Sequence, residues 1–118
     1  MVDPVVYVTL GGSFGAVSRH LVGEMVDDTG FPVSTLAVNV LGSLALGLLA
    51  FGNAGTAAFT TFGTGACGAF TTFSSFSFET VRLYETGARA RAFFNAGVNL
   101  IGSLTAIGLA WGLTGIFL

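Results

Sequence analysis

The most regular feature of the chain is the alternation of long hydrophobic runs with short polar segments. No Asp, Glu, Lys, Arg or His occurs in residues 29–78, and none occurs in residues 92–118. Because a helix needs about 20 apolar residues to cross a bilayer, the first run can hold two spanning helices and the second can hold one. A fourth is expected in residues 4–25, where the polar residues near the far end are Arg19, His20 and Glu24. The pattern predicts an all-α membrane protein with four transmembrane helices.

Turn residues between the runs set the expected helix boundaries within one membrane domain, residues 1–118. The helices are expected at about residues 5–26, 34–51, 56–84 and 92–117. The third contains several glycines followed by two threonines, and none of these residues strongly favours a helix. We therefore expect the third helix to be broken near residues 67–72. Lipid cannot satisfy the unpaired amides and carbonyls of a broken helix, so they have to face protein, water or an ion.

The composition supports a membrane protein and argues against an enzyme. Hydrophobic residues make up 53% of the chain and charged residues only 8%, whereas soluble domains carry about 25% charged residues. The chain has one cysteine, Cys67, and one histidine, and no pair of carboxylates lies within a hydrophobic run. Most metal, thiol and acid–base sites are thereby excluded. No enzymatic activity is expected, and nothing indicates a nucleic-acid partner.

Glycine is unusually common, with 18 residues, and in a membrane it allows helices to approach closely. Gly11–Gly15 and Gly108–Gly112 have GxxxG spacing, and Ser43–Gly47 is a variant with two small residues. Together these pairs predict tight helix packing, including packing at an oligomer interface.

Several polar residues lie within the hydrophobic runs, where they are costly to bury and often functional. Arg19 could carry its charge to the membrane surface or hold it near the mouth of an anion pathway. Asn39 could hydrogen-bond between helices or line such a pathway. Asn95, Asn99 and Ser103 are spaced four apart and share one face of the last helix, where the same two interpretations apply.

A polar face and an aromatic face adjoin in the segment after the glycines. Thr72, Ser75 and Glu79 follow helical spacing on one face, and Phe73 and Phe76 lie on the neighbouring one. A stripe of phenylalanines is usually core packing. The edge of a phenyl ring is nevertheless positive, so two rings beside hydroxyls could also face a small anion.

Four stretches occur in a distinctive order, and they are GGSFGAVSRH (11–20), STLAVNVLGSLALG (34–47), GTGACGAFTTFSSFSFE (63–79) and NAGVNLIGSL (95–104). In their order and spacing, over nearly the whole chain, they resemble the Fluc (CrcB) family of fluoride channels. The resemblance implies antiparallel dimers of four-helix subunits, with two narrow pores along the dimer interface. It also implies that the backbone carbonyls of Gly68 and Thr71, at the break, hold a buried structural sodium ion. Ala69 stands beside this site where many members have glycine.

The resemblance also assigns an ion pathway to individual residues. It implies that Phe73 and Phe76 are the pore phenylalanines and that Asn39 is the pore asparagine. The residues implied for a hydroxyl track are Ser74, Ser75 and Ser103. Arg19 matches an arginine near the vestibule, and Glu79 matches an acidic residue after the second phenylalanine. The implied role is passive exit of fluoride through a multi-pass protein of the cell membrane, which lowers fluoride toxicity.

The basic residues fall on one side of the expected membrane. Arg89 and Arg91 lie between the third and fourth helices, Arg19 and Arg82 lie near the same side, and the other side has no Lys or Arg. The positive-inside rule then puts both termini outside. A subunit that inserts in both orientations should have more balanced charge. The partner is therefore either a second copy or a homologous, oppositely oriented subunit.

Two other classes of membrane protein are compatible with four short helices. A small proton-coupled multidrug exporter needs a titratable carboxylate deep in the bundle, but Glu24 lies near a span end and Glu79 is followed by Arg82. A structural membrane subunit would carry no ion flux.

Overall fold

All regular structure in the described part of the chain is helical. The computed structural model describes residues 2–118, and its elements are α1 (Pro4–Met25), α2 (Val33–Phe51), α3 (Thr56–Ala58), the π-helix η1 (Phe59–Cys67), α4 (Gly68–Phe70), α5 (Ser74–Glu85) and α6 (Arg89–Phe117). Since α3, η1 and α4 follow one another without a gap, they form one rod, which α5 extends after an interruption. The expectation of an all-helical fold with four helical segments is confirmed.

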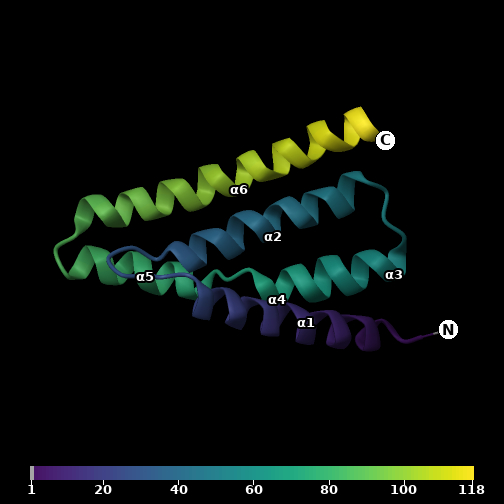
Figure 1. Ribbon diagram of the computed structural model, residues 1–118, viewed down its shortest axis with the longest axis horizontal. Helices are drawn as coiled ribbons and strands as arrows, with labels where there is room; N and C mark the ends of the chain where they lie inside the picture. Colours follow the sequence, from purple (N-terminus) through teal and green to yellow (C-terminus); the bar gives the residue numbers. More distant parts are fainter. Residues whose placement is uncertain (1) are drawn as a thin grey trace.

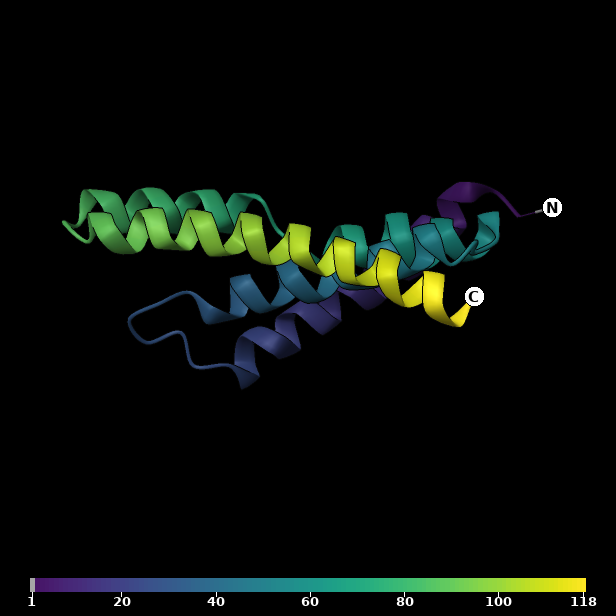
Figure 2. The same cartoon turned by 90° about the horizontal axis from the view of Figure 1, so that it is seen from above.

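The helices lie side by side in a thin, elongated molecule of 53 × 32 × 21 Å. α6 runs along α2 and α5, and α1 runs along η1 and α4 (Figure 1). The turned view in Figure 2 shows two diverging arms at one end. One arm is α5 with the first part of α6, and the other is formed by the ends of α1 and α2 around residues 26–32.

Local sequence signals explain where the helices begin and where the chain turns. Asp3 caps α1 by accepting a hydrogen bond from the amide of Val5 at 2.9 Å, and Pro4 occupies the first turn, where its missing N–H costs nothing. Before α2, a carboxylate oxygen of Asp28 accepts from the amide of Ser34 at 2.7 Å. Gly87 turns the chain between α5 and α6 with a φ of 93°, which favours glycine.

Glycines bring α1 and η1 into backbone contact. A Cβ atom on Gly11 would lie 1.7 Å from the carbonyl oxygen of Thr61, and one on Gly15 would lie 2.1 Å from that of Ala66. No side chain fits between the two elements, so the tight packing predicted for Gly11–Gly15 is confirmed and lies within the subunit. The π-helical winding of η1 accompanies this contact.

The other two small-residue pairs differ from each other. A Cβ atom on Gly47 would lie 2.7 Å from the Cβ of Ala110, so α2 and α6 approach closely as the Ser43–Gly47 pair predicts. Added Cβ atoms at Gly108 and Gly112 would meet nothing within 4 Å. That face of α6 is therefore open in the single chain.

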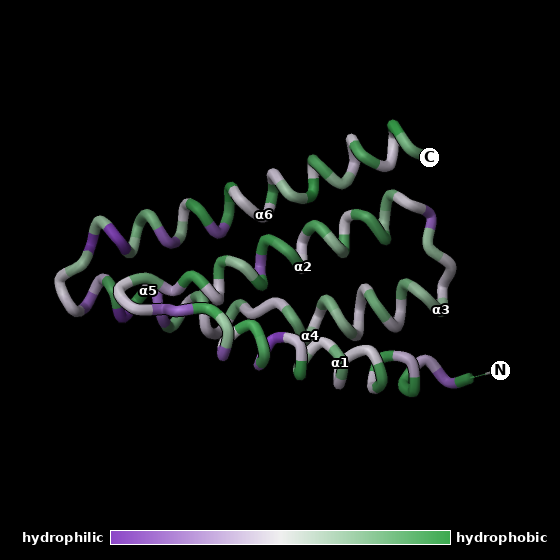
Figure 3. Tube along the Cα trace, viewed as in Figure 1, coloured by the Kyte–Doolittle hydropathy of each residue, from purple (hydrophilic) through white to green (hydrophobic). Residues whose placement is uncertain are grey.

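The distribution of side chains is the reverse of that in a soluble domain. The largest fully buried side chain in the described part of the chain is Asn95, whereas Phe14, Phe93 and Trp111 are 65–71% exposed. Hydrophobic positions dominate α2 and the second half of α6 (Figure 3). These two helices are long and apolar enough to cross a membrane. Such an exterior is stable when its surroundings are lipid or another subunit.

The backbone contact between α1 and η1 should not tolerate one added methyl group. We expect Gly15→Ala to lower the free energy of unfolding by about 2 kcal/mol, because the Cβ overlaps the backbone of Ala66 and cannot be relieved by a rotamer change. The matched control on α1 is Gly23→Ala, where nothing lies within 4 Å and alanine favours the helix. The stability of both variants is measured by unfolding in detergent. Equal stabilities would contradict the close backbone contact between α1 and η1.

Candidate functional site

The third helical segment is interrupted partway along its length. α4 ends at Phe70, α5 begins at Ser74, and the three residues between them are not helical. At Thr71 the backbone becomes extended, with φ −79° and ψ 162°. The interruption lies between the two halves of the rod and beside α2 (Figure 1).

One asparagine side chain satisfies the backbone at the interruption. The amide N–H of Thr72 donates to Oδ1 of Asn39 at 2.8 Å, and Nδ2 of Asn39 donates to the carbonyl oxygen of Thr72 at 3.1 Å. The Thr72 hydroxyl accepts from the amide of Ser75 at 3.1 Å and so caps the start of α5. Thr72 is buried, so these bonds replace the helical partners that it lacks.

Two carbonyl oxygens at the interruption remain available. Within residues 2–118, no donor hydrogen-bonds to the carbonyl oxygens of Gly68 or Thr71. The last carbonyls of a helix have no intrahelical partner, and free backbone carbonyls in an unwound segment are the groups that coordinate sodium in membrane proteins. Gly68 is exposed and Thr71 half-buried, and both line one cavity. Two free carbonyl oxygens are of the kind that a sodium ion can bind.

The residues predicted from the sequence lie along two cavities that flank the interruption. The phenylalanine cavity, of about 640 Å³, is lined by Asn39, Gly68, Thr71, Phe73, Phe76 and Ser103 among others. The polar cavity, of about 560 Å³, is lined by Arg19, Ser74, Ser75 and Glu79 among others. Thr72 lines both cavities, so it lies between them at the interruption.

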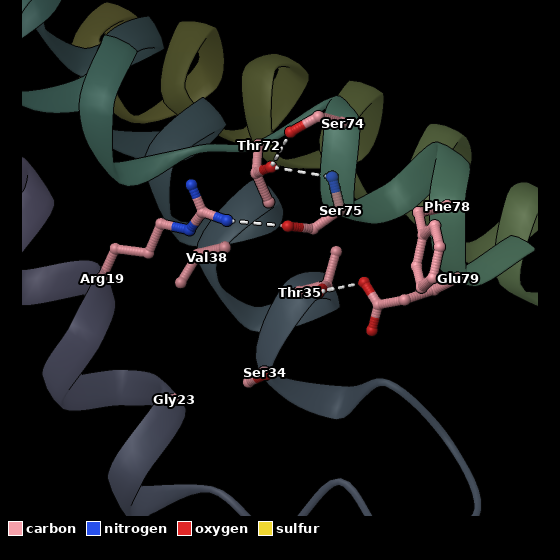
Figure 4. Close-up of a pocket in the computed structure, with 10 residues that line it drawn as sticks. All are labelled: Arg19, Gly23, Ser34, Thr35, Val38, Thr72, Ser74, Ser75, Phe78 and Glu79. Atoms are coloured by element: carbon pink, nitrogen blue, oxygen red, sulfur yellow. Dashed lines mark hydrogen bonds between the residues drawn. The ribbon is translucent and has the colours of Figure 1, made fainter.

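The polar cavity lies between the two arms and carries one charge of each sign. Nη2 of Arg19 donates to the hydroxyl of Ser75 at 2.7 Å, which brings the guanidinium across from α1 to α5 (Figure 4). The hydroxyl of Thr35 donates to Oε1 of Glu79 at 2.7 Å. The guanidinium of Arg19 therefore points into the cavity, and it presents a positive charge where an anion could enter.

The phenylalanine cavity is open on the surface of the single chain. Phe73 is 79% exposed. Its ring centroid lies 5.9 Å from that of Phe76, and the ring planes are inclined by 50°. Tilted rings present edges as well as faces, and the edges are the positive part of the quadrupole.

Buried amides connect the interruption to α6. Nδ2 of Asn39 donates to Oδ1 of Asn99 at 3.1 Å, and Nδ2 of Asn99 donates to Oδ1 of Asn95 at 3.0 Å. The interhelical hydrogen bonding considered for these residues is confirmed. Both N–H groups of Asn39 are thereby engaged, one by Thr72 and one by Asn99. In this conformation Asn39 lines the cavity without an N–H to spare.

Sequence reasoning assigned no role to three hydroxyl residues that act here, and it noted only Thr72, as part of a polar face. Thr35 binds Glu79, Thr72 carries the interruption, and Thr80 accepts from Nδ2 of Asn95 at 2.8 Å. The polar spacing of Thr72 with Ser75 was the only signal available for these three. In the sequence, Thr35 and Thr80 cannot be told apart from the threonines whose hydroxyl bonds only to their own helix.

The family model described as CrcB-like protein, Camphor Resistance (CrcB), matches residues 6–112. The chain belongs to the CrcB-like family. Among curated relatives it is 51% identical over 109 residues to "Fluoride-specific ion channel FluC 2" of Haloarcula marismortui, covering 92% of each chain. It is 45% identical over 108 residues to "Fluoride-specific ion channel FluC 1" of Halobacterium salinarum, covering 92% of this chain and 91% of the relative. It is also 44% identical over 109 residues to "Fluoride-specific ion channel FluC" of Sphingopyxis alaskensis, covering 86% of each.

In this CrcB-like chain, removing the Asn39 amide should destabilise the interruption. Asn39→Ala leaves the N–H and C=O of Thr72 and Oδ1 of Asn99 without their partner, and we expect a loss of about 2 kcal/mol in the free energy of unfolding. Ser43→Ala, one turn further along α2 and lining the same cavity, is the control. Stability is measured by unfolding in detergent. The same stability in both variants would contradict a stabilising role of the hydrogen bonds between Asn39 and Thr72.

Proposed function

We propose that the chain is a subunit of a fluoride-selective channel that lets fluoride leave the cell passively through the cell membrane, which it crosses several times. The observation that carries the proposal is the pair of cavities on either side of Thr72, beside a helix interruption with free carbonyls. The printed names of the relatives support fluoride as the ion. The protein is then a channel, and no bond is made or broken.

The side chains along the two cavities suit a small anion. Fluoride is strongly hydrated, so a narrow path has to replace its water with other donors. The Arg19 guanidinium and the hydroxyls of Ser74 and Ser75 offer donors on the polar side, and Ser103 offers one on the other. The ring edges of Phe73 and Phe76 add weak positive contacts. Several modest sites in series let an ion pass, whereas one strong site would trap it.

Selectivity against chloride would follow from width and from donor strength. Chloride is larger, so a path that fits fluoride excludes it sterically. It also gains less from close hydroxyl and amide donors, because its charge is more diffuse. Glu79 lies on the wall of the polar cavity with its carboxylate held by Thr35. Its negative charge opposes that of Arg19 and moderates the attraction of an anion.

A second subunit would complete the path. Phe73 is 79% exposed and the phenylalanine cavity is open in the single chain, although a pore has to be enclosed. The open faces at Gly108 and Gly112 give a partner room for close packing. We propose an antiparallel dimer of four-helix subunits with two pores along the interface. The partner is a second copy or a homologous subunit of opposite orientation, and the one-sided distribution of arginines is the argument for the homologous subunit.

A structural sodium ion fits the same dimer. The carbonyl oxygens of Gly68 and Thr71 from each of two subunits would supply four ligands to a central site. The ion would contribute a fixed positive charge near both pores. For the chain itself, it would satisfy carbonyls that lipid cannot hydrogen-bond. Ala69 is small and leaves these backbone contacts accessible.

Fluoride efflux from liposomes tests the proposed function directly. We expect a passive, voltage-driven fluoride flux measured with a fluoride electrode and little chloride flux under the same gradient. Phe73→Ile and Phe76→Ile should each reduce fluoride flux by about tenfold or more, because an aliphatic side chain lacks the positive ring edge. The control Phe93→Ile changes an exposed phenylalanine on α6 that lines neither cavity.

Two results would contradict this function, and a third would contradict the role of the two phenylalanine rings. Fluoride flux driven by an imposed proton gradient and accompanied by drug transport would indicate the proton-coupled exporter. Absence of any ion flux from a folded, reconstituted protein would indicate a structural subunit. Normal flux in both phenylalanine variants would show that the two rings only pack against other side chains and do not contact the ion.

Sodium should stabilise the protein specifically. Extraction and reconstitution in N-methyl-D-glucamine should lower both the melting temperature and the fluoride flux, because the carbonyls of Gly68 and Thr71 lose their ligand. Addition of sodium should restore both, and potassium at the same ionic strength should restore less. An equal melting temperature in N-methyl-D-glucamine, sodium and potassium would contradict the proposed sodium site.

A further inference from the structure

We propose that a series of hydrogen bonds from Thr72 to the carbonyl of Phe76 positions the phenylalanine pair and thereby sets the preference of the channel for fluoride over chloride. The inference rests on the proposed function. It assigns a role to Asn95 and Asn99, for which the sequence left both helix packing and a polar path open. It also assigns a role to Thr80, which the sequence did not single out.

The hydrogen bonds run head to tail in one direction. The Thr72 amide donates to Oδ1 of Asn39 at 2.8 Å, and Nδ2 of Asn39 donates to Oδ1 of Asn99 at 3.1 Å. Nδ2 of Asn99 donates to Oδ1 of Asn95 at 3.0 Å, and Nδ2 of Asn95 donates to the Thr80 hydroxyl at 2.8 Å. The Thr80 hydroxyl then donates to the carbonyl oxygen of Phe76 at 2.7 Å. Each side chain thus accepts one bond of the chain and donates the next.

The two ends of this chain bracket the phenylalanines. Thr72 immediately precedes Phe73, and the last acceptor is the backbone of Phe76 itself. Between these ends the chain passes through α2 and α6, which are the helices that pack against α5. The segment that carries the two rings is therefore fixed at one point to α2, through Asn39, and at one point to α6, through Asn95. These two contacts set the height and rotation of the rings.

Two members of this series of hydrogen bonds, Asn95 and Thr80, cannot contact an ion in either cavity, whereas Asn39 and Asn99 line the phenylalanine cavity. Asn95 is 0% exposed and Asn99 is 5% exposed. Neither Asn95 nor Thr80 lines the phenylalanine cavity or the polar cavity. Any effect of these two residues on ion selectivity has to act through the residues that they hold, so they are positioning residues.

Because these hydrogen bonds all run in one direction, the series is sensitive to the loss of any one of them. Hydrogen bonds in a series polarise one another, and inside a protein they are stronger than in water. If Thr80 cannot accept, the amide of Asn95 loses its partner on α5, and the constraint on Phe76 is lost with it. Simple adhesion between helices, the alternative role of membrane asparagines, would affect stability and leave selectivity unchanged.

Thr80 offers the sharpest variants because it lies at the far end of the chain from Thr72. Thr80→Val keeps the shape and removes the hydroxyl, whereas Thr80→Ser keeps the hydroxyl. Thr86→Val is the control on the same segment, since the hydroxyl of Thr86 bonds only to its own helix. Fluoride and chloride flux are measured in parallel for each protein in liposomes.

We expect the ratio of fluoride to chloride flux to fall about fivefold in Thr80→Val, the equivalent of one neutral hydrogen bond, and to stay at the original value in Thr80→Ser and Thr86→Val. An unchanged ratio in Thr80→Val would overturn the proposal. A proportional loss of both fluxes would overturn it as well, because that is the result of a merely structural role.

A second measurement does not depend on transport. Hydrogen exchange at the Thr72 amide should accelerate about fivefold in Thr80→Val relative to Thr80→Ser, because the two residues are ends of one chain. If the unmodified protein carried no fluoride, the proposed function would fail on its own. In that case accelerated exchange at Thr72 would still support the chain, and unchanged exchange would overturn it.

Discussion

The contact on which the site depends is the pair of hydrogen bonds between the Asn39 amide and the backbone of Thr72. Three non-helical residues within a hydrophobic segment present polar groups that lipid cannot satisfy. The Asn39 amide supplies both a donor and an acceptor, and so it replaces the two helical bonds that Thr72 lacks. The interruption can persist because of this clamp. The free carbonyls of Gly68 and Thr71 and the projection of Phe73 at the start of α5 depend on the interruption, and therefore on these two hydrogen bonds.

A second constraint, the backbone contact of α1 with η1, positions the charge of the site. Gly11 and Gly15 bring the two elements together without side chains between them. Arg19 lies one helical turn after Gly15, on the same face of α1. The close approach therefore puts the guanidinium within reach of Ser75 on α5, although the two residues are 56 positions apart in the sequence. A larger residue at Gly15 would move Arg19 outward together with α1. The glycines near the start of the chain and the polar cavity are in this way parts of one arrangement.

The helical segments could be predicted from the sequence because hydrophobic run length alone decides how many spans fit. Details that depend on tertiary contacts could not. The glycines of the third helix predict a break near residues 67–72, but in the structure Gly63, Gly65 and Gly68 are helical, and the non-helical residues are Thr71–Phe73. Gly65 instead allows a close contact, since an added Cβ would lie 2.9 Å from the carbonyl oxygen of Val8. The four-residue spacing of Asn95 and Asn99 did reveal that they act together, since that spacing is a property of the helix. Their partners on other elements, Asn39 and Thr80, depend on how the helices are packed.

The engagement of Asn39 determines which donors remain for an ion. With both of its N–H groups bonded to protein, an anion beside Asn39 would have to break one of those bonds to reach a donor. The groups left along the cavities are hydroxyls, one guanidinium that is already bonded to Ser75, and ring edges. The hydroxyls and ring edges are neutral partners that bind an anion only modestly, and the guanidinium shares its charge with Ser75. A set of weak partners suits conduction, because an ion that is held tightly does not leave. The buried amides are used to hold the walls in place, and the proposed channel thereby separates the groups that define its shape from the groups that meet the ion.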